Sequence, residues 1–512
     1  MSKILDCTLR DGGYYTNWDF SSDIVQKYFH SFNNLPVEYL EIGYRSKPMN
    51  KYLGEYFYCP DYVLDSIKKI SNKKLVIILD EKDVLKEDAV SLLEPCKGIV
   101  TMVRMAIDPQ NFKRALGLAQ EVKKMGFEVG FNVMYMSSWK ENKDFLDLIG
   151  EVTGIADIFY MVDSYGGVFP EDVKSIYNLV KEKTTVPIGF HGHNNLEMGL
   201  INTLTAIECG AEMVDATVTG MGRGAGNLKT ELLLTALNAR DGLEVDFNSL
   251  SQVTDAFEEL QMEYGWGTNL PYMVSGANSL PQKDVMEWVS KRYYSFNSII
   301  RALHNQKENV KDNESLPLFK TEKKFSKALI IGGGPSTINH KKALRSFIEK
   351  TDDMCVIFAS SKNAGVFADI EKDQYYSLVG NEGLRLSAVF DKIENFSGKC
   401  ILPPYPRKMG TFIPEKVRNT SYELESVTFT DVVNDSHTVL ALQTAIELGV
   451  KEIYVTGYDG YSNAKIGTKE QELFVENEAL FKDIATFGIN PVSLTPTRYK
   501  GLKANSVYAH II

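Results

Sequence analysis

The chain has 512 residues, of which 44% are hydrophobic and 24% are charged, and its formal net charge is -11. This length predicts two to four domains. The composition is that of a globular protein that can bury several hydrophobic cores without stabilising cross-links. The negative charge argues against a nucleic-acid partner, because affinity for phosphate backbones depends mainly on clustered Lys and Arg.

The cysteines and the first residues predict a cytoplasmic location. Six cysteines are scattered without a CxxC pair, as expected in a reducing compartment and without structural zinc. Met1-Ser2-Lys3 leads directly into a strand pattern, and no apolar run approaches the roughly 18 residues that span a bilayer. We therefore expect a protein that acts on small molecules, without a membrane partner. The sequence leaves its oligomeric state open and allows a homo-oligomer.

Short β-rich runs alternate with amphipathic stretches through the first half of the chain. Eight such runs are predicted as strands, at residues 3–8, 39–45, 74–81, 98–107, 128–136, 158–166, 187–193 and 212–220. Eight strand-then-helix units within residues 1–245 predict a TIM (β/α)8 barrel. An open doubly wound sheet is the alternative, but the lack of a dinucleotide fingerprint in these units favours a closed barrel.

The second half predicts a different organisation. Residues 246–303 are expected to form a helical extension, and the polar run 304–325 a linker. A smaller Rossmann-like α/β domain is predicted over 326–512, opening with the strand and turn "KALIIGGGPS". This turn lacks the third glycine of GxGxxG. Its predicted phosphate- or nucleotide-binding residues are Gly332, Gly333, Gly334 and Ser336, and the alternative is a structural domain without a ligand.

If the barrel forms, its active site should lie at the C-terminal ends of the strands. Polar residues do gather at these predicted ends, namely Arg10, Asp11, Tyr44, Arg104, Asn132, Asp163, Ser164, His191 and His193, followed by the Gly-rich "GMGRGAGN" at 220–227. Each has a simpler explanation alone: Arg10 and Asp11 as a local ion pair, Asp163 and Ser164 as a helix cap, and the Gly-rich run as a flexible loop or anion nest.

The pair His191 and His193 indicates a metal site. Residues i and i+2 of a strand point to the same side, so the two imidazoles can converge on one ion. Imidazole with a carboxylate suits Mn²⁺, Fe²⁺, Co²⁺ or Zn²⁺. A chance HxH on a polar strand end is about equally probable for the pair alone, and an Asp at the end of another strand favours the metal.

Four motifs occur in the order and at the strand ends of a known superfamily: "TLRDG" at 8–12, "DSYG" at 163–166, "HGHN" at 191–194 and "GRGAGN" at 222–227. Together they resemble the metal-dependent (β/α)8 lyases and aldolases that include HMG-CoA lyase, isopropylmalate synthase and 4-hydroxy-2-oxovalerate aldolase. The resemblance implies a divalent metal cation, Mn²⁺ first and Mg²⁺, Co²⁺ or Zn²⁺ as alternatives. Its implied ligands are Asp11, His191, His193 and, as in the lyase branch, Asn227.

The resemblance also implies roles for the substrate-facing residues. Arg10 would steady an enolate oxygen. From their positions at the strand ends, Ser164 is predicted to hydrogen-bond the substrate carboxylate and Arg104 to bind substrate. The synthase branch reads DGEQ where this chain reads Asp11-Gly12-Gly13-Tyr14, which makes acyl-CoA condensation a weaker alternative. Tyr14 stands where the hydroxyoxovalerate aldolases have a basic His, and a phenol with a pKa near 10 is a poor base. Tyr14 is the predicted proton-handling group, with Tyr15, a metal-bound water or another loop as alternatives.

The predicted function is that of a class II, metal-dependent carbon–carbon lyase. It would join or cleave pyruvate, or a related 2-oxo acid, and an aldehyde through a metal-bound enolate. The alternatives are an HMG-CoA-lyase-like or Claisen-type acyl-CoA enzyme, and a catalytically silent barrel that serves as a scaffold. The C-terminal half resembles the Rossmann-like domains of bacterial sialyltransferase-like and motility-accessory glycosyltransferase-like proteins. That resemblance implies a setting in carbohydrate biosynthesis.

Overall fold

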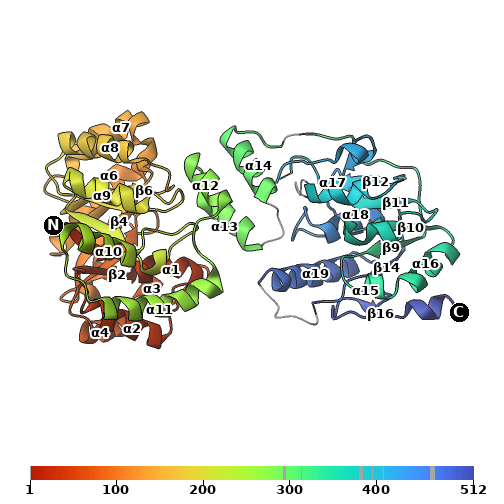
Figure 1. Ribbon diagram of the computed structural model, residues 1–512, viewed down its shortest axis with the longest axis horizontal. Coiled ribbons are helices and arrows are strands. Elements are labelled where there is room, and N and C mark those ends of the chain that lie inside the picture. Colours follow the sequence, from red (N-terminus) through yellow and green to blue (C-terminus); the bar gives the residue numbers. More distant parts are fainter. Residues whose placement is uncertain are drawn as a thin grey trace. The chain divides into compact units, whose positions relative to one another are not determined.

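The computed structural model describes residues 2–291, 296–312, 314–379, 384–394, 396–407, 409–461 and 468–512. The chain divides into two compact units, Met1–Met286 and Glu287–Ile512 (Figure 1). The division falls within helix α13 (Gln282–Lys291).

The first unit is a closed barrel of eight parallel strands in sequence order. The last strand pairs with the first, with Ile4 opposite Val214, and this pairing closes the cylinder. The eight predicted strands and the predicted TIM barrel are confirmed. The strands are β1 Lys3–Asp6, β2 Tyr39–Tyr44, β3 Lys74–Asp80, β4 Val100–Ile107, β5 Glu128–Val133, β6 Ile158–Asp163, β7 Ile188–Gly192 and β8 Met213–Ala216.

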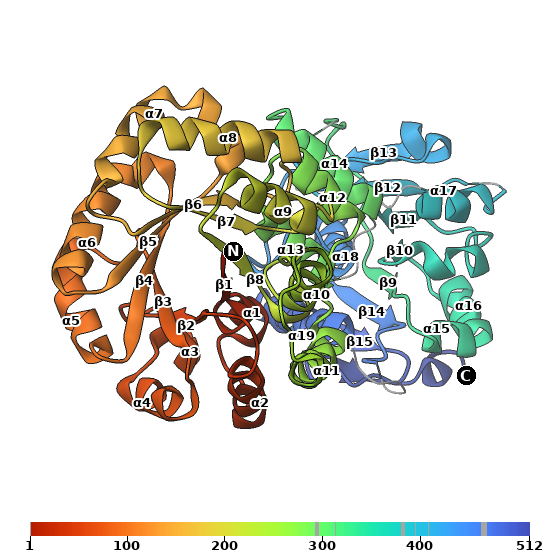
Figure 2. The ribbon, with the colours of Figure 1, turned by 60° about the vertical axis from the view of Figure 1, so that its left-hand side comes forward.

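Helices surround the barrel strands, as Figure 2 shows. The α-helices before the division are α1 Thr8–Thr16, α2 Ser22–Phe32, α3 Glu55–Tyr58, α4 Asp61–Ile70, α5 Ala89–Leu93, α6 Phe112–Lys124, α7 Lys143–Leu148, α8 Pro170–Lys183, α9 Gly199–Cys209, α10 Thr230–Asp241, α11 Phe247–Tyr264 and α12 Leu270–Ala277. Short 3-10 turns join some of them, at Lys86–Asp88, Glu94–Cys96, Pro109–Asn111, Met136–Glu141, Ile149–Val152 and Val218–Gly220.

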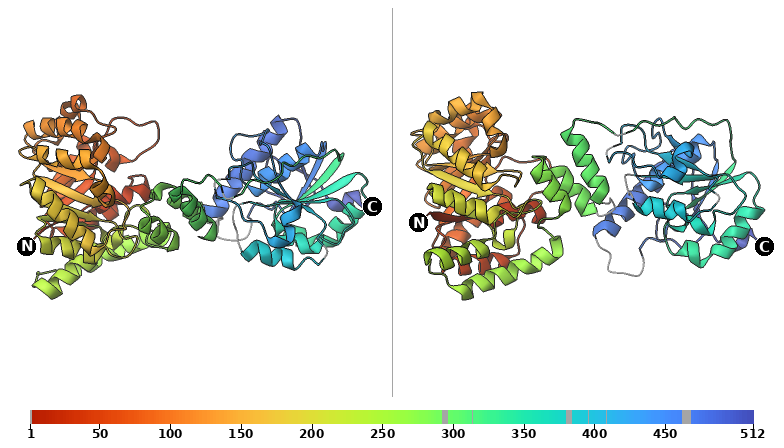
Figure 3. Two further views of the ribbon diagram at one scale, coloured as in Figure 1. Left: turned by 90° about the horizontal axis from the view of Figure 1, so that it is seen from above. Right: turned by 45° about the horizontal axis from the view of Figure 1, so that its top comes forward.

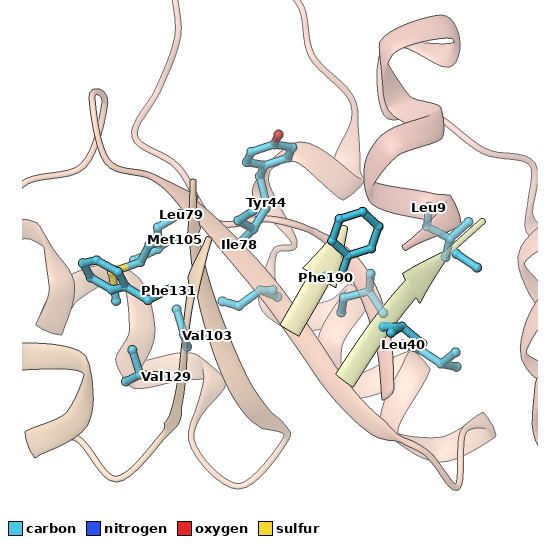
Figure 4. Close-up of a cluster of buried hydrophobic side chains, with 14 of the residues drawn as sticks. Leu9, Leu40, Tyr44, Ile78, Leu79, Val103, Met105, Val129, Phe131 and Phe190 are labelled. Carbon is cyan, nitrogen blue, oxygen red and sulfur yellow. The ribbon is translucent and has the colours of Figure 1, made fainter. Parts of the chain in front are cut away.

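Alternation along the strands decides which side chains enter the barrel. In β4, Met102 packs with the inner cluster, whereas Val103 and Met105 pack in the outer cluster. Figure 4 shows part of that outer cluster, in which side chains from β2 to β5 gather with Phe190 of β7. The same alternation places Glu41, Arg104, Asp215 and His191 on the inner side of their strands.

The sequence predicts a strand over residues 3–8, whereas β1 ends at Asp6 and Thr8–Thr16 forms helix α1. Its two glycines do not leave room for a substrate. A Cβ on Gly12 would lie 2.5 Å from Met221 Sδ, and one on Gly13 would lie 2.2 Å from the Trp18 ring. The glycines therefore allow side chains of the protein itself to pack against α1.

Asp6, at the end of β1, holds the first strand to three helices. Its carboxylate accepts hydrogen bonds from the Thr8 amide and hydroxyl, at 2.9 and 2.6 Å, and from the Tyr28 hydroxyl at 2.7 Å. The Thr230 hydroxyl donates to the second oxygen. Burial raises the pKa of Asp6 to about 6, and these hydrogen bonds counteract the rise.

We expect Asp6 to make the protein less stable as the pH rises from about 4 to about 6. The raised pKa means that the folded state keeps a proton in this range that the unfolded chain, with a pKa near 4, releases. Relative to Asp6→Asn, the wild type should lose about 3 kcal/mol of unfolding free energy across this range. Denaturant unfolding at several pH values measures the difference. Asp23→Asn, an equal charge change at the exposed start of α2, should show no such trend, and a flat difference for Asp6→Asn would contradict the assignment.

The second unit contains an eight-stranded parallel sheet of order β13-β12-β11-β10-β9-β14-β15-β16 (Figure 3). The predicted second α/β domain is confirmed. The strands are β9 Lys327–Ile331, β10 Met354–Phe358, β11 Gln374–Ser377, β12 Lys399–Leu402, β13 Ser421–Glu423, β14 Glu452–Thr456, β15 Val492–Ser493 and β16 Lys503–Ala504. The order of the strands reverses between β9 and β14, the place where such sheets bind ligands at their carboxyl edge.

Helices cover both faces of this sheet. Ala328 and Ile330 pack in a cluster with α18, whereas their neighbours Leu329 and Ile331 pack in a second cluster with α16. The helices that follow the division are α14 Phe296–Lys307, α15 Ser336–Asn339, α16 Lys341–Lys350, α17 Leu384–Asp391, α18 His437–Glu447 and α19 Thr468–Thr486, and 3-10 turns occupy Ser361–Val366, Glu415–Thr420 and Val507–His510.

The polar run 304–325 belongs to the second unit. Phe319 donates its amide to the Glu423 carbonyl at 2.7 Å, beside strand β13. Asp312 is buried and pairs with Arg407, which also binds Glu423 at 2.9 Å. Within the described ranges, no helix combines the length and the apolar character that crossing a bilayer requires.

Candidate metal centre

The four predicted metal ligands come from three places at the carboxyl end of the barrel. Asp11 lies on α1, His191 is the fourth residue of β7, His193 follows this strand, and Asn227 ends the Gly-rich loop. The Asn227 amide donates to Asp11 Oδ2 at 2.7 Å, and His191 Nε2 lies 3.8 Å from the same oxygen. The centres of the two imidazole rings are 5.1 Å apart, and the backbones of His193 and Asn227 form an isolated antiparallel β-bridge.

Hydrogen bonds fix the tautomer of both histidines. His193 Nδ1 lies 2.7 Å from the Asp163 carbonyl oxygen, which can only accept, so Nδ1 must carry the proton. His191 Nδ1 lies 2.8 Å from Asp215 Oδ2 and donates to this carboxylate. Burial and the neighbouring His191 lower the pKa of His193 to about 3. In the neutral form of each ring, Nε2 is therefore the nitrogen with a free lone pair, as a metal ligand requires.

Asn227 supplies an acceptor without a donor. Its Oδ1 atom is buried and has no hydrogen-bond partner among the described residues, whereas its Nδ2 atom binds Asp11. A buried acceptor of this kind costs free energy unless a cation or a donor meets it. The glycine at position 222 leaves room for the Asn227 side-chain amide, because a Cβ on Gly222 would lie 2.4 Å from Asn227 Nδ2.

A network of buried charges lies beneath these groups. Arg10 Nε donates to Glu41 at 2.7 Å and Nη1 to Asp11, while Arg104 pairs with Glu41 and Asp215. Burial alone would raise the pKa of Asp11, but Arg10 and the histidines hold it below the ordinary value. Three carboxylates share two guanidinium groups, so one negative charge remains for a cation to balance. The donor set and its charge fit a divalent metal.

A second set of potential ligand atoms overlaps the first. Cys7, His191 and Asp215 offer atoms that all lie within 4.8 Å of one another. In this set, however, Asp215 already binds Arg104 and the protonated nitrogen of His191. Burial raises the pKa of Cys7 well above its ordinary value, which favours the thiol over the thiolate that metals bind. We assign this set to positioning.

The structure places the predicted substrate-binding residues at different depths. The Ser164 hydroxyl oxygen accepts a hydrogen bond from the Tyr135 backbone amide at 2.9 Å. The hydroxyl hydrogen of Ser164 has no acceptor among the described residues. Arg104 is completely buried, donates to Asn132 at 3.0 Å and lies over the Tyr160 ring. Its guanidinium is thus engaged by the protein.

The candidate proton-handling residues differ in the same way. The Tyr14 ring is 36% exposed, and its hydroxyl lies 3.3 Å from that of Tyr44. Burial and the neighbouring Tyr14 raise the pKa of Tyr44 well above its ordinary value, so Tyr44 keeps its proton. Tyr15 donates to the Gly224 carbonyl, and burial raises its pKa to about 12.

Two residues of the centre were missed in the sequence: Glu41 and Asp215. Glu41 and Asp215 are single acidic residues within apolar runs, in "YLEIGY" and "MVDA". Their buried position in a barrel strand is the signal that could have identified them, because a buried carboxylate needs a partner. Tyr44 was expected at a strand end, and the structure adds its contact with Tyr14.

The segment after α11 lies against the loops of this face. The Trp266 indole donates to the Thr219 carbonyl at 3.2 Å, and Gln282 donates to Asn195 at 2.6 Å. Asn195 in turn donates to the Tyr272 carbonyl. These bonds hold the Gly-rich loop and the segment after β7 in place.

The predicted phosphate-binding turn of the second unit lies at the reversal of strand order. The amides of Gly332 and Gly334 donate to the carbonyls of Thr456 and Gly457, at 2.8 and 2.9 Å. The Ser336 amide lies 3.4 Å from a carboxylate oxygen of Asp459. Gly333 approaches the Ser360 side chain. Phosphate or nucleotide binding by this turn stays a prediction.

Comparison with known proteins agrees with this geometry. The HMGL-like family model matches residues 2–257. A 4-hydroxy-2-oxovalerate aldolase of Geobacillus genomosp. 3 is 32% identical over 50% of this chain and 75% of its own length. An oxaloacetate decarboxylase of Mycobacterium tuberculosis is 28% identical over 47% of this chain and 71% of its own length.

A solved structure resembles the same half. The crystallised N-terminal domain of a candidate aldolase from Bacteroides vulgatus is 58% identical, with a TM-score of 0.56, and the match covers 59% of this chain and 99% of that domain. The family model spans the barrel, and the Geobacillus aldolase is matched over three quarters of its length. The chain therefore belongs to the HMGL-like family.

Proposed function

We propose that the protein is a divalent-metal-dependent aldolase that joins or cleaves pyruvate, or a related 2-oxo acid, and an aldehyde. The observation that carries this proposal is the pair of free Nε2 atoms on His191 and His193, beside Asp11 and the unpartnered Asn227 Oδ1. These four residues would hold the metal. When bound, a divalent cation supplies Lewis-acid polarisation of the 2-oxo group.

Arg10 is placed to stabilise the negative charge that develops on the substrate oxygen. Two of its nitrogens are held by Glu41 and Asp11, while Nη2 has no hydrogen-bond partner among the described residues. A guanidinium held in this way is pre-organised, so it needs no rearrangement when the enolate forms. The free hydroxyl hydrogen of Ser164 suits the substrate carboxylate.

Tyr14 is our proposal for the residue that handles the methyl proton. Its hydroxyl is the exposed member of the Tyr14–Tyr44 pair, and Tyr44 can hydrogen-bond to it while staying protonated. The Tyr14→Phe variant removes this hydroxyl and keeps the ring that packs on Trp18. We expect it to slow enolisation by about 100-fold, the usual scale for a general acid or base. An unchanged rate across the pH range would assign the role to another group.

Exchange of the pyruvate methyl protons with deuterated water tests the function. Enolisation is common to every aldehyde partner, so the assay needs no knowledge of that partner. Proton NMR should show exchange with Mn²⁺ present and none after chelation. Turnover of an acyl-CoA without exchange would favour the acyl-CoA alternative, and metal-free protein without either activity would favour a scaffold.

Decarboxylation of oxaloacetate is a second candidate, because one relative carries that name. It would produce the same pyruvate enolate, so Arg10 and the metal ligands would keep their roles. Release of CO₂ from oxaloacetate, compared with carbon–carbon bond formation from pyruvate and an aldehyde panel, separates the two reactions.

A further inference from the structure

Arg223 is a cation without a charged partner at the outer side of the metal centre. It lies in the middle of the Gly-rich loop and is half-buried. Its guanidinium lies 5.2 Å from the centre of the Tyr14 ring. Among the described residues, its side chain makes no hydrogen bond or ion pair. A cation–π contact uses none of the guanidinium N–H donors, so they stay available for an anion.

The charge of Arg223 also acts on Tyr135, in the segment that follows β5. Burial raises the pKa of Tyr135, and Arg223 and Lys82 counteract this rise. Lys82 pairs with Asp80 at 2.7 Å, so of these two cations Arg223 is the one left without a carboxylate among the described residues.

The backbone at Tyr135 adds an independent sign of a built site. Tyr135 follows β5 and has a φ of 61°, in the left-handed region that a bulky residue rarely occupies. Such a conformation is strained and persists mainly where function requires it. In this conformation the Tyr135 amide donates a hydrogen bond to the Ser164 hydroxyl oxygen, and the centre of the Tyr135 ring lies 5.3 Å from that of Tyr165.

Depth decides which substrate Arg223 would meet. Asp11 and His191 are almost completely buried, and Arg10 and Ser164 lie with them, so the 2-oxo acid would occupy the inner position. Tyr14, the ring against which Arg223 lies, is partly exposed. A group that binds Arg223 therefore belongs to the reactant that enters second and lies outermost.

We infer that the aldehyde substrate carries an anionic group, a carboxylate or a phosphate, and that Arg223 binds it. This inference rests on the proposed aldolase function and adds the class of its second substrate. The planar guanidinium suits both anions, because it can donate two parallel hydrogen bonds to either.

Matched aldehydes test the inference with pyruvate and Mn²⁺. The pairs are 4-oxobutanoate with butanal, and glyceraldehyde 3-phosphate with glyceraldehyde. At least one anionic aldehyde should have a kcat/KM more than about 10-fold above its neutral counterpart. Arg223→Gln should lower kcat/KM for that aldehyde by about 10- to 100-fold and leave the neutral one within about twofold. Arg223→Lys should retain part of the preference.

The controls separate this inference from the proposed function. Arg240→Gln makes the same charge change on the outside of α10, where Arg240 pairs with Asp241, and should alter neither pair. Pyruvate exchange without aldehyde should be unchanged in Arg223→Gln. Exchange in the wild type, without preference for an anionic aldehyde or with equal losses for both members of a pair, would overturn the inference and leave the function intact.

Direct binding decides the matter if the wild type shows no exchange. Glycerol 3-phosphate and butanoate cannot react as aldehydes, and glycerol is their neutral counterpart. Calorimetric binding of one of these anions to the wild type, weakened at least about 10-fold in Arg223→Gln, would support an anion site on a protein with another function. Binding that is absent, or equal in the two proteins, would overturn it.

Discussion

The Arg10→Gln variant is expected to exchange pyruvate methyl protons about 100- to 1,000-fold more slowly than the wild type, the usual range for removing one electrostatic stabiliser. Glutamine keeps a donor near Glu41 but has no charge to offer the developing enolate. Because Nη2 is the nitrogen of Arg10 without a partner among the described residues, the loss should fall mainly on kcat.

Two further variants show whether the loss comes from the charge or from its geometry. Arg10→Lys keeps the charge but cannot hold Glu41 and Asp11 while also pointing a third donor at the substrate, so we expect an intermediate rate. Arg345→Gln removes an arginine that pairs with Asp369 in the second unit and should exchange at the wild-type rate. Arg10→Gln with normal exchange and normal metal content would remove Arg10 from the mechanism.

The barrel could be predicted because its signals are local and repeated. Each strand is a short apolar run between turn residues, and eight of them in order leave few topologies open. The proximity of the proposed metal ligands could be predicted for a related reason. The carboxyl ends of parallel strands meet at one face, so His191 and Asp11 had to approach each other once the barrel was correct.

The helix at Thr8–Thr16 could not be predicted from local preferences. Two adjacent glycines and a following Tyr-Tyr-Thr disfavour a helix. Tertiary packing decides otherwise, since Met221 and Trp18 fill the space that side chains at Gly12 and Gly13 would need. These contacts come from residues that are 209 and 5 positions away, and only the fold brings the first of them close.

The buried pairings were also beyond the sequence. The composition of 304–325 is typical of an exposed connection, yet Asp312 is buried against Arg407, 95 residues further along. Arg104 was expected at the substrate because it lies on a barrel strand. Whether it faces the substrate or the network below depends on its depth along the barrel axis, which the register of β4 against β3 and β5 sets.

The second large expected effect concerns which of the two overlapping sets of residues binds the metal. His191 belongs to both sets, so its replacement cannot distinguish them. Asp11, His193 and Asn227 belong only to the set with free Nε2 atoms, and Cys7 belongs only to the set beneath it. Asp215 would be a metal ligand in the set that contains Cys7. In the set that contains Asp11, it would only orient His191 through a hydrogen bond.

We expect Asp11→Asn and His193→Asn to lose Mn²⁺ binding, measured by calorimetry on metal-free protein, while Cys7→Ala binds within about threefold of the wild type. Asp215→Asn should bind about 10- to 100-fold more weakly, the usual cost of losing the partner that orients a ligating histidine. Removing that carboxylate also leaves Arg104 buried with Glu41 as its remaining carboxylate partner, so the unfolding free energy should fall by about 3–5 kcal/mol. Cys7→Ala causes no comparable charge imbalance and controls for repacking of the interior. If Cys7→Ala abolished Mn²⁺ binding while His193→Asn retained it, the metal would be bound by the set that contains Cys7, and the free nitrogen of His193 would need another explanation.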